Sequence, residues 1–175
     1  SVRERTLALI SIAHPSFQQE LLDAAKARHY VMPSQLAMPA SGRPYPSEVV
    51  TESALKDGRR VLFRPLRPDD ERALRDFFHS HSDDTVYLRY GTPLKRLAPK
   101  QVQHFVTLDY DQRMALGAFV APSEARGSDL DRLIGIARYD LDPSTNLAEC
   151  AFVIHDDFQG QGLGTQLLLK LMRYA

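Results

Sequence analysis

A run of small residues between an apolar strand and an amphipathic helix is the part of the sequence best suited to binding chemistry. The run consists of Gln159, Gly160, Gln161, Gly162, Leu163 and Gly164. Because glycine has no Cβ, such a loop adopts positive φ easily and lets a ligand approach its backbone. The N–H groups of the helical turn that follows point into the loop with a partial positive charge. The spacing therefore predicts a phosphate or pyrophosphate site.

The strand before the loop, LAECAFVI (147–154), holds an acid and the single cysteine of the chain. Glu149 is costly to bury among apolar residues, which marks it as a candidate functional carboxylate. The structural alternative is an ion pair with an arginine such as Arg138, since buried pairs also occur without a catalytic role. Cys150 is expected to be a buried packing residue rather than a reactive thiol.

Other polar residues fit structural roles better than functional ones. Four histidines lack the spacing of metal ligands, so packing or solvated roles are expected and no metal site is predicted. They are His79, His81, His104 and His155. Asp156 and Asp157 are expected to cap or solvate the turn before the loop. Four arginines could meet a phosphate of the ligand, but a solvent-facing role is favoured. They are Arg59, Arg60, Arg64 and Arg67.

The glycine run has two alternative interpretations, a dinucleotide site and a structural loop. The nicotinamide dinucleotide fingerprint G-x-G-x-x-G is not strictly present, because the glycines fall at 160, 162 and 164. This spacing disfavours a dinucleotide site. The remaining alternative is a loop with a purely structural role.

The composition is that of an ordinary globular protein. Hydrophobic residues make up 43% and charged residues 25% of the 175 positions, and acids and bases balance at 22 each. No net charge draws the chain to nucleic acid or to a membrane surface, so neither partner is expected. The single cysteine fits a reducing compartment, and no apolar run approaches the ~18 residues of a membrane helix. The expectation is a soluble, cytoplasmic protein.

The first third of the chain divides at a proline-rich connector. Residues 1–12 hold an apolar patch too short to classify, and a helix is predicted from Pro15 to about residue 28, with Phe17, Leu21, Leu22 and Ala25 on one face. The stretch VMPSQLAMPASGRPYPS has four prolines and no apolar period, which indicates an extended connector. A domain boundary is therefore placed at 46/47.

The remainder predicts an α+β domain. Lys56-Asp57-Gly58-Arg59 reads as a hairpin turn, and helices are predicted from about 67, from 85 to 90 and from 99 to about 107. Strands are predicted at 114–121, 132–140 and 147–154, and their short links favour an antiparallel meander. The last helix has an apolar face of Leu163, Leu167, Leu168, Leu171 and Met172.

The loop and this order of elements resemble the GNAT superfamily of N-acyltransferases. The run Gln159–Gly164 matches its Q/R-x-x-G-x-G/A pyrophosphate loop, and AECAFVIHDDFQGQGLGTQLL resembles bacterial protein-lysine acetyltransferases. The resemblance covers about 58–175 and extends to RVLFRPLRPDDERALRDFFHSHSDDTVYLRYGTP. It implies a GNAT-like mixed sheet with flanking helices and acetyl-CoA as co-substrate.

The resemblance also assigns roles to residues. It implies that the pyrophosphate lies on 159–164, with Thr165 offering its hydroxyl. The pantetheine arm would follow the backbone of Phe152, Val153 and Ile154 as an added strand. Glu149 occupies the position of the general base that deprotonates the attacking amine, which implies a protein lysine or another amine as acceptor.

The N-terminal segment LALISIAHPSFQQELLDAAKARHY resembles the C-terminal end of acetyl-CoA hydrolase/transferase proteins. Residues 1–46 are thus expected to be the tail of a CoA-transferase-like domain plus the connector. Residues 47–175 are expected to be an acyltransferase domain that is incomplete at its C-terminus, without the strand and helix that follow in the superfamily. Two alternatives remain open: a non-catalytic CoA-binding regulatory module, and a homodimer that forms through the open sheet edge after Ile154.

Overall fold

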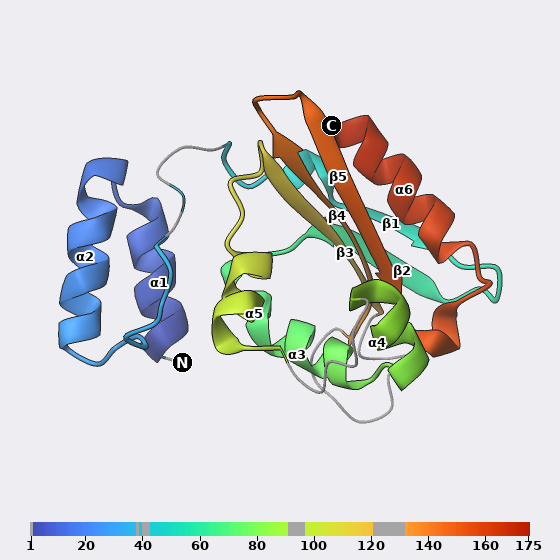
Figure 1. Cartoon of the computed structure of the whole chain (residues 1–175), viewed down its shortest axis with the longest axis horizontal. Coiled ribbons are helices and arrows are strands. Elements are labelled where there is room, and N and C mark those ends of the chain that lie inside the picture. Colours follow the sequence, from blue (N-terminus) through green and yellow to red (C-terminus); the bar gives the residue numbers. More distant parts are fainter. Residues whose placement is uncertain (1, 38, 40–42, 91–96, 121–131) are drawn as a thin grey trace.

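The chain folds into one sheet with helices on both faces and a separate pair of helices at its N-terminus (Figure 1). This computed structural model describes residues 2–37, 39, 43–90, 97–120 and 132–175. Within these ranges the sheet has five strands in the order β1-β2-β3-β4-β5. Their bounds are Thr51–Ala54 (β1), Arg60–Pro65 (β2), Arg113–Val120 (β3), Arg132–Asp142 (β4) and Leu147–Ile154 (β5). Each strand pairs with the next in antiparallel fashion, which confirms the predicted meander.

Two tight turns fix the register at the ends of the sheet. In the turn between β1 and β2, Gly58 has φ +87° and the Leu55 N–H donates to Arg59 O at 2.9 Å. In the turn between β4 and β5, Asp142 Oδ1 accepts hydrogen bonds from the backbone N–H of Ser144 at 2.9 Å and from its hydroxyl at 2.7 Å. Glycine tolerates positive φ, and Asp side chains commonly bond backbone two residues ahead, so both turns are locally encoded.

Helices cover the two faces of the sheet unequally (Figure 1). The first face carries α3 (Glu71–His79), α4 (Asp83–Tyr90) and α5 (Pro99–Val106), and the opposite face carries α6 (Leu163–Tyr174). The segment predicted as a helix from about 67 begins with a 3-10 turn, Pro68–Asp70, before α3. Among the described helices, none is long and apolar enough to cross a membrane.

The buried stripe of α6 is narrower than the sequence suggested. Leu163, Leu167 and Leu171 are at most 2% exposed, as predicted. Leu168 and Met172 were expected on the same face, but they are 40% and 66% exposed. The helix rests on a sheet rather than sinking into a core, so only residues about one turn apart reach the strands.

The N-terminal segment forms a two-helix hairpin, α1 (Val2–Ile12) and α2 (Pro15–Ala27). Residues 1–12, which the sequence left unclassified, are therefore mostly helical. The hairpin has its own small core of Leu7, Ile10, Leu22, Ala25 and Val31. Phe17 and Leu21 were expected on the buried face, but they are 57% and 42% exposed. With only one neighbouring helix, α2 has too little surface to cover four apolar positions.

Polar contacts connect the hairpin and the connector to the sheet domain. Arg3 Nη2 lies 2.7 Å from Gln35 Oε1 and 2.5 Å from Glu71 Oε1 at the start of α3. The backbone N–H of Leu36 donates to the fully buried Gln103 Oε1 of α5 at 2.8 Å. These bonds fix the hairpin against α3 and α5.

Candidate active site

The glycine run forms a tight turn into α6, as its composition predicted. Gly160 has φ +72° and Gly162, the N-cap of α6, has φ +80°. The first helical bond runs from Gln166 N to Gly162 O at 3.1 Å. The preceding N–H groups, those of Leu163, Gly164 and Thr165, have no acceptor within the helix and point toward the turn. Since glycine carries no capping side chain, this end of α6 is suited to an anion.

The space over this turn is open. A Cβ built at Gly160 or Gly164 would meet nothing within 4 Å, and one at Gly162 would meet only Lys56 Cε, at 3.7 Å. Thr165 is exposed, which leaves its hydroxyl accessible. Leu163 is 1% exposed. This residue, predicted to bind cofactor, can therefore offer a ligand only its backbone.

β5 is an edge strand whose second half lies beside the turn. Within the described chain it pairs only with β4. Phe152, Val153 and Ile154 are half-buried, and their backbone forms the end of the strand nearest the glycine turn. An edge strand presents unpaired N–H and C=O groups, which can accept an added extended ligand.

Glu149 lies in the exposed first half of β5, so its expected burial is wrong. It stands directly opposite Asp140 of β4. The alternative ion pair with Arg138 is absent too, because the Arg138 guanidinium pairs with Asp140 and stacks 4.7 Å from the Phe105 ring. An edge strand lacks the second neighbour that would have covered the carboxylate.

Cys150 is exposed as well, which corrects its expected burial. Successive strand residues point to opposite faces. Ala151 and Val153 face α3 and α5, whereas Ile154 lies against Leu163 and Leu167 of α6 across Gly135. By this alternation Glu149 belongs to the face of α3–α5 and Cys150 to the face of α6.

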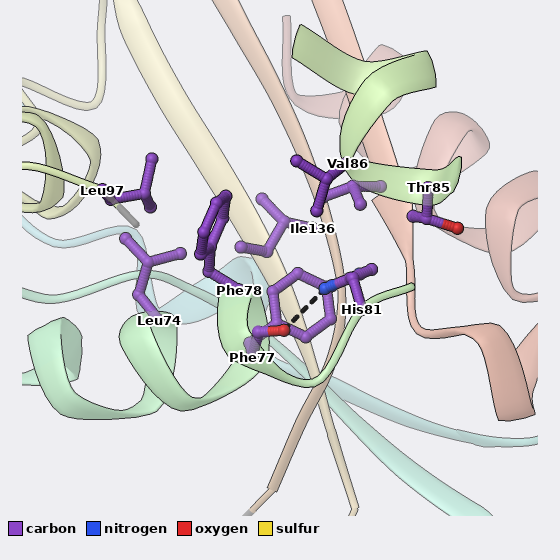
Figure 2. Close-up of a pocket in the computed structure, with 9 residues that line it drawn as sticks. Leu74, Phe77, Phe78, His81, Thr85, Val86, Leu97 and Ile136 are labelled. Atoms are coloured by element: carbon purple, nitrogen blue, oxygen red, sulfur yellow. Dashed lines mark hydrogen bonds between the residues drawn. The ribbon is translucent and has the colours of Figure 1, made fainter. Parts of the chain in front are cut away.

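Two small apolar cavities lie between the α3–α5 layer and the sheet. The first, of about 20 Å³, is lined by Leu74, Phe77, Phe78, His81, Thr85, Val86, Leu97, Ile136 and Val153 (Figure 2). The second, of about 30 Å³, is lined by Leu66, Leu74, Phe105, Ala115, Ile136, Arg138, Ala151 and Val153. Each has room for about one water. Val153 lines both cavities, so they lie along the same face of β5 as Glu149.

His81 contributes the polar wall of the first cavity. Its Nδ1 lies 2.6 Å from Phe77 O, so this nitrogen carries the proton and donates (Figure 2). Nε2 is buried and has no hydrogen-bond partner among the described residues. The predicted packing role of this histidine is confirmed by its edge contact with the Phe77 ring at 4.4 Å.

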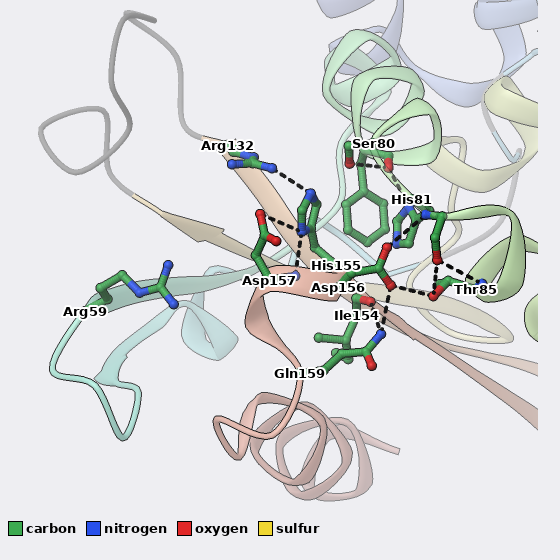
Figure 3. Close-up of polar contacts among 12 residues, drawn as sticks. Arg59, Ser80, His81, Thr85, Arg132, Ile154, His155, Asp156, Asp157 and Gln159 are labelled. Atoms are coloured by element: carbon green, nitrogen blue, oxygen red, sulfur yellow. Dashed lines mark hydrogen bonds and ion pairs between the residues drawn. The ribbon is translucent and has the colours of Figure 1, made fainter.

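His155 anchors the turn to β4 (Figure 3). The residue is 4% exposed, and its N–H donates to Ile134 O at 2.9 Å. Its Nε2 lies 2.6 Å from Arg132 Nη2, a group that can only donate. Burial first, and then the charge of Arg132, lower the pKa of His155, so the ring is neutral at neutral pH and accepts from the guanidinium.

The arginine cluster is mostly engaged in contacts within the protein. Arg64 forms a two-pronged pair with Asp70, at 2.7 Å for each bond. Arg67 stacks over Tyr45, and Arg59 pairs with Asp57 while its guanidinium lies 4.0 Å from the Phe158 ring centroid. Arg60 is exposed. Only Arg59 approaches the glycine turn, through Phe158.

Sequence reasoning missed two residues near the turn, Lys56 and Arg132, and did not foresee the long-range contacts of a third, Asp156. Lys56 approaches Gly162 from the β1–β2 turn, Arg132 reaches His155 from β4, and Asp156 bonds α4 across more than 70 positions. Asp156 was expected to cap or solvate the turn before the loop, but its carboxylate bonds Ser82 and Thr85 at the start of α4. No local pattern marks such contacts, since they depend on the sheet bringing the strand ends together.

In the described ranges, no three His, Cys, Asp or Glu side chains lie close enough together to hold a metal ion. His79 and His104 are exposed, and His104 lies near Arg113.

Comparison with known proteins places the chain in a family. The model of the Acetyltransferase (GNAT) family matches residues 74–175. Acetyltransferase PA5475 of Pseudomonas aeruginosa is 36% identical over 122 residues, which cover 70% of this chain and 63% of that protein. The chain thus spans less than two thirds of the length of this curated relative.

A solved structure agrees with this match. The crystal structure of the GNAT domain of S. lividans PAT superposes with a TM-score of 0.66 at 28% identity, over 75% of this chain and 74% of that chain. Its likeness extends to the antiparallel sheet and the flanking helices described above. With more than half of its length matched by the family model, the chain belongs to the GNAT family of acetyltransferases.

Proposed function

We propose that this chain is the catalytic part of an N-acetyltransferase that transfers the acetyl group of acetyl-CoA to a lysine amine of a protein. The observation that carries the proposal is the turn at Gly160 and Gly162, which directs three backbone N–H groups of α6 toward the free end of β5. Family membership supports acetyl transfer. The choice of lysine rests on the resemblance of residues 148–168 to protein-lysine acetyltransferases.

The turn and β5 would hold acetyl-CoA in two parts. The pyrophosphate would lie on residues 159–164, where N–H groups and the dipole of α6 favour negative charge. The hydroxyl of Thr165 is accessible for the same phosphates. The pantetheine arm has amides that would pair with the edge backbone of Phe152, Val153 and Ile154.

Glu149 would act as the general base. Its carboxylate takes a proton from the acceptor ammonium, and the freed amine attacks the thioester carbonyl. The tetrahedral intermediate collapses, the C–S bond breaks and the CoA thiolate leaves and takes up a proton. The exposure of Glu149 suits a bulky acceptor, since a lysine on another protein can reach it without opening the fold.

Residues 1–46 would be the end of a CoA-transferase-like domain in a larger fusion, with the acyltransferase domain at 47–175. The separate core of the α1–α2 hairpin is consistent with such a division. In that arrangement one domain handles the CoA thioester and the other transfers its acyl group to an amine.

Titration calorimetry with acetyl-CoA tests the cofactor site. The wild-type chain should bind, whereas Gly162→Val should not, because its side chain would occupy the place of the pyrophosphate. Valine at Gly162 also strains a φ of +80°, so Gly58→Val, at φ +87° in the β1–β2 turn, is the matched control. It carries similar strain away from the site.

Absence of acetyl-CoA binding to the wild type at millimolar concentration would refute the cofactor site. Equal loss of binding in Gly58→Val and Gly162→Val would attribute the effect to strain alone. Binding without acetylation of any offered protein or amine, in the full-length protein, would favour the regulatory module over the enzyme.

A further inference from the structure

Asp156 makes three hydrogen bonds that join separate elements (Figure 3). Its Oδ2 accepts from the Ser82 backbone N–H at 2.8 Å, and its Oδ1 accepts from the Thr85 hydroxyl at 2.5 Å. Oδ1 also accepts from Gln159 Nε2 at 3.1 Å. Ser82 and Thr85 lie at the start of α4, whereas Gln159 is the first residue of the glycine run. One side chain therefore connects α4 with the loop.

Only an ionised carboxylate satisfies all three partners, because each of them donates. The hydrogen bond from Thr85 is the main cause that lowers the pKa of Asp156, so the group is charged at neutral pH. Its negative charge also lies at the N-terminus of α4, where the helix dipole favours it. Asparagine would turn an NH₂ group toward one of the donors and lose that bond.

Gln159 extends the connection to the strand. The same Nε2 that donates to Asp156 also lies 3.2 Å from Ile154 O, the last residue of β5. The side chain of the first loop residue is thereby held between the strand end and the carboxylate. Its direction, and with it the path of the backbone into Gly160, depends on Asp156.

α4 has few other attachments to the sheet. It is eight residues long, and of its described side chains Val86 is buried in the core and, with Thr85, lines the small apolar cavity that Val153 of β5 also lines. Figure 2 shows Thr85 and Val86 at this cavity. A helix this short has little stability of its own, so its placement depends on tertiary contacts. The bonds to Asp156 satisfy N–H and hydroxyl groups at its first turn.

We propose that Asp156 is a positioning residue that couples the glycine loop to α4. Ligand binding on the loop and the placement of α4 over β5 then change together. This inference rests on the proposed function, since the ligand is taken to be the pyrophosphate of acetyl-CoA. Asp156 touches neither the ligand nor the reacting atoms; it acts through Gln159 on one side and through Ser82 and Thr85 on the other.

The test compares Asp156→Asn with Asp157→Asn. Asp157 is the matched control, since it lies in the same turn, its side chain is 73% exposed, and its carboxylate lies 3.7 Å from Nδ1 of the neutral His155 ring, beyond hydrogen-bond distance. Acetyl-CoA affinity is measured by calorimetry, and amide hydrogen exchange is followed at residues 82–86 and 159–166, with and without acetyl-CoA. Thr85→Val removes one of the three bonds from the side of α4.

In the ligand-free chain, Asp156→Asn should speed exchange at 82–86, and Asp157→Asn should not. Acetyl-CoA should slow exchange at 82–86 in the wild type, and this protection should vanish in Asp156→Asn while protection at 159–166 persists. Affinity should fall about tenfold in Asp156→Asn, as expected when a charge-assisted bond is lost. Thr85→Val should reproduce part of the loss, and the double variant should lose less than the sum of both.

If the wild type binds acetyl-CoA, and Asp156→Asn and Asp157→Asn show the same affinity and the same protection of residues 82–86, the positioning role is overturned. The proposed function is not affected by that result. A drop in thermal stability of Asp156→Asn without any change in affinity or coupling would also overturn the positioning role, since that result describes a purely structural cap. Failure of the wild type to bind acetyl-CoA would instead overturn the proposed function.

Discussion

At the scale of single residues, Glu149 and Cys150 illustrate how neighbours in sequence separate in space. They are adjacent and both exposed, yet strand alternation places them on opposite faces of β5. Glu149 shares its face with Val153 and the apolar cavities, whereas Cys150 lies on the face of α6. The proposed direct transfer to an amine, with Glu149 as base, therefore needs no thioester intermediate on Cys150, which lies on the opposite face of the strand.

Glu149→Gln should lower kcat in the full-length protein by about 10²–10⁴, the usual contribution of a general base, and leave acetyl-CoA affinity intact. Cys150→Ala is the matched variant on the opposite face and should keep wild-type turnover. Both are measured by steady-state acetylation of a lysine-bearing protein. Unchanged turnover in Glu149→Gln would exclude it as the base, and a collapse in Cys150→Ala would indicate a covalent route.

His155 predicts how stability depends on pH. Its folded-state pKa is lowered, chiefly by burial, so the unfolded chain binds a proton at a higher pH than the native chain does. The contribution of neutral His155 to the free energy of unfolding should therefore be fully present above about pH 6.5. It should decrease as the pH falls below that value, by at most about 1.4 kcal/mol per pH unit.

Chemical denaturation at pH 7.5 and at pH 5.5 measures this dependence. His155→Gln keeps an acceptor for Arg132 and should flatten the slope. His104 has a lowered pKa as well, but it lies exposed near Arg113, so His104→Gln should change the slope less. An identical slope in the wild type and in His155→Gln would show that another group titrates.

At the scale of elements, local patterns predicted the order of strands and helices in the sheet domain, but they left α1 unclassified. Asp57-Gly58 specified the β1–β2 turn, and the apolar runs specified β3, β4 and β5 to within about two residues. What the patterns could not give was the neighbour of each element. Glu149 and Cys150 were expected to be buried because β5 reads as apolar, but burial depends on a second partner that an edge strand lacks.

A substitution at Gly135 of β4 would measure how closely α6 packs against the sheet next to the glycine turn. A Cβ there would lie 3.0 Å from Ile154 Cδ1, 3.1 Å from Leu167 Cδ1 and 3.2 Å from Leu163 Cδ2. Gly135→Ala should therefore destabilise the fold by about 1–3 kcal/mol, as overpacking does.

The matched control is Gly164→Ala in the first turn of α6, where a Cβ meets nothing within 4 Å and φ is not positive. Alanine should be neutral or slightly stabilising there, because it favours helix more than glycine does. Denaturant midpoints of the two variants are compared. A neutral Gly135→Ala would mean that α6 shifts freely on the sheet.

At the scale of the whole molecule, polar contacts between described residues connect the helical hairpin, which has its own core, to the sheet domain. Arg3 bridges Gln35 and the buried Glu71, and Leu36 bonds Gln103. The proline-rich connector predicts a domain boundary at 46/47, which stays a prediction. The docking of the hairpin on the sheet domain could not be predicted from the sequence, because it depends on a contact between Arg3 and Glu71, which are 68 residues apart.

Arg3→Ala should loosen this junction. It leaves Glu71, with 10% of its side chain exposed, without its cation, at a cost of about 1–3 kcal/mol. Limited proteolysis within residues 28–46 should become faster, and the melting temperature should fall. Arg28→Ala, whose side chain bonds only the Ala24 carbonyl one turn away, is the control and should change neither. Equal cleavage rates in both variants would show that Arg3 does not hold the hairpin.

The free edge of β5 has a thermodynamic consequence for the assembly of the protein. An edge has one set of hydrogen-bonding groups, so a pantetheine arm and a strand of a second chain cannot both occupy it. Under the proposed function, ligand binding and self-association through this edge would compete for the same backbone by mass action. Added acetyl-CoA would then shift the protein toward the monomer, and removal of acetyl-CoA would favour association through β5.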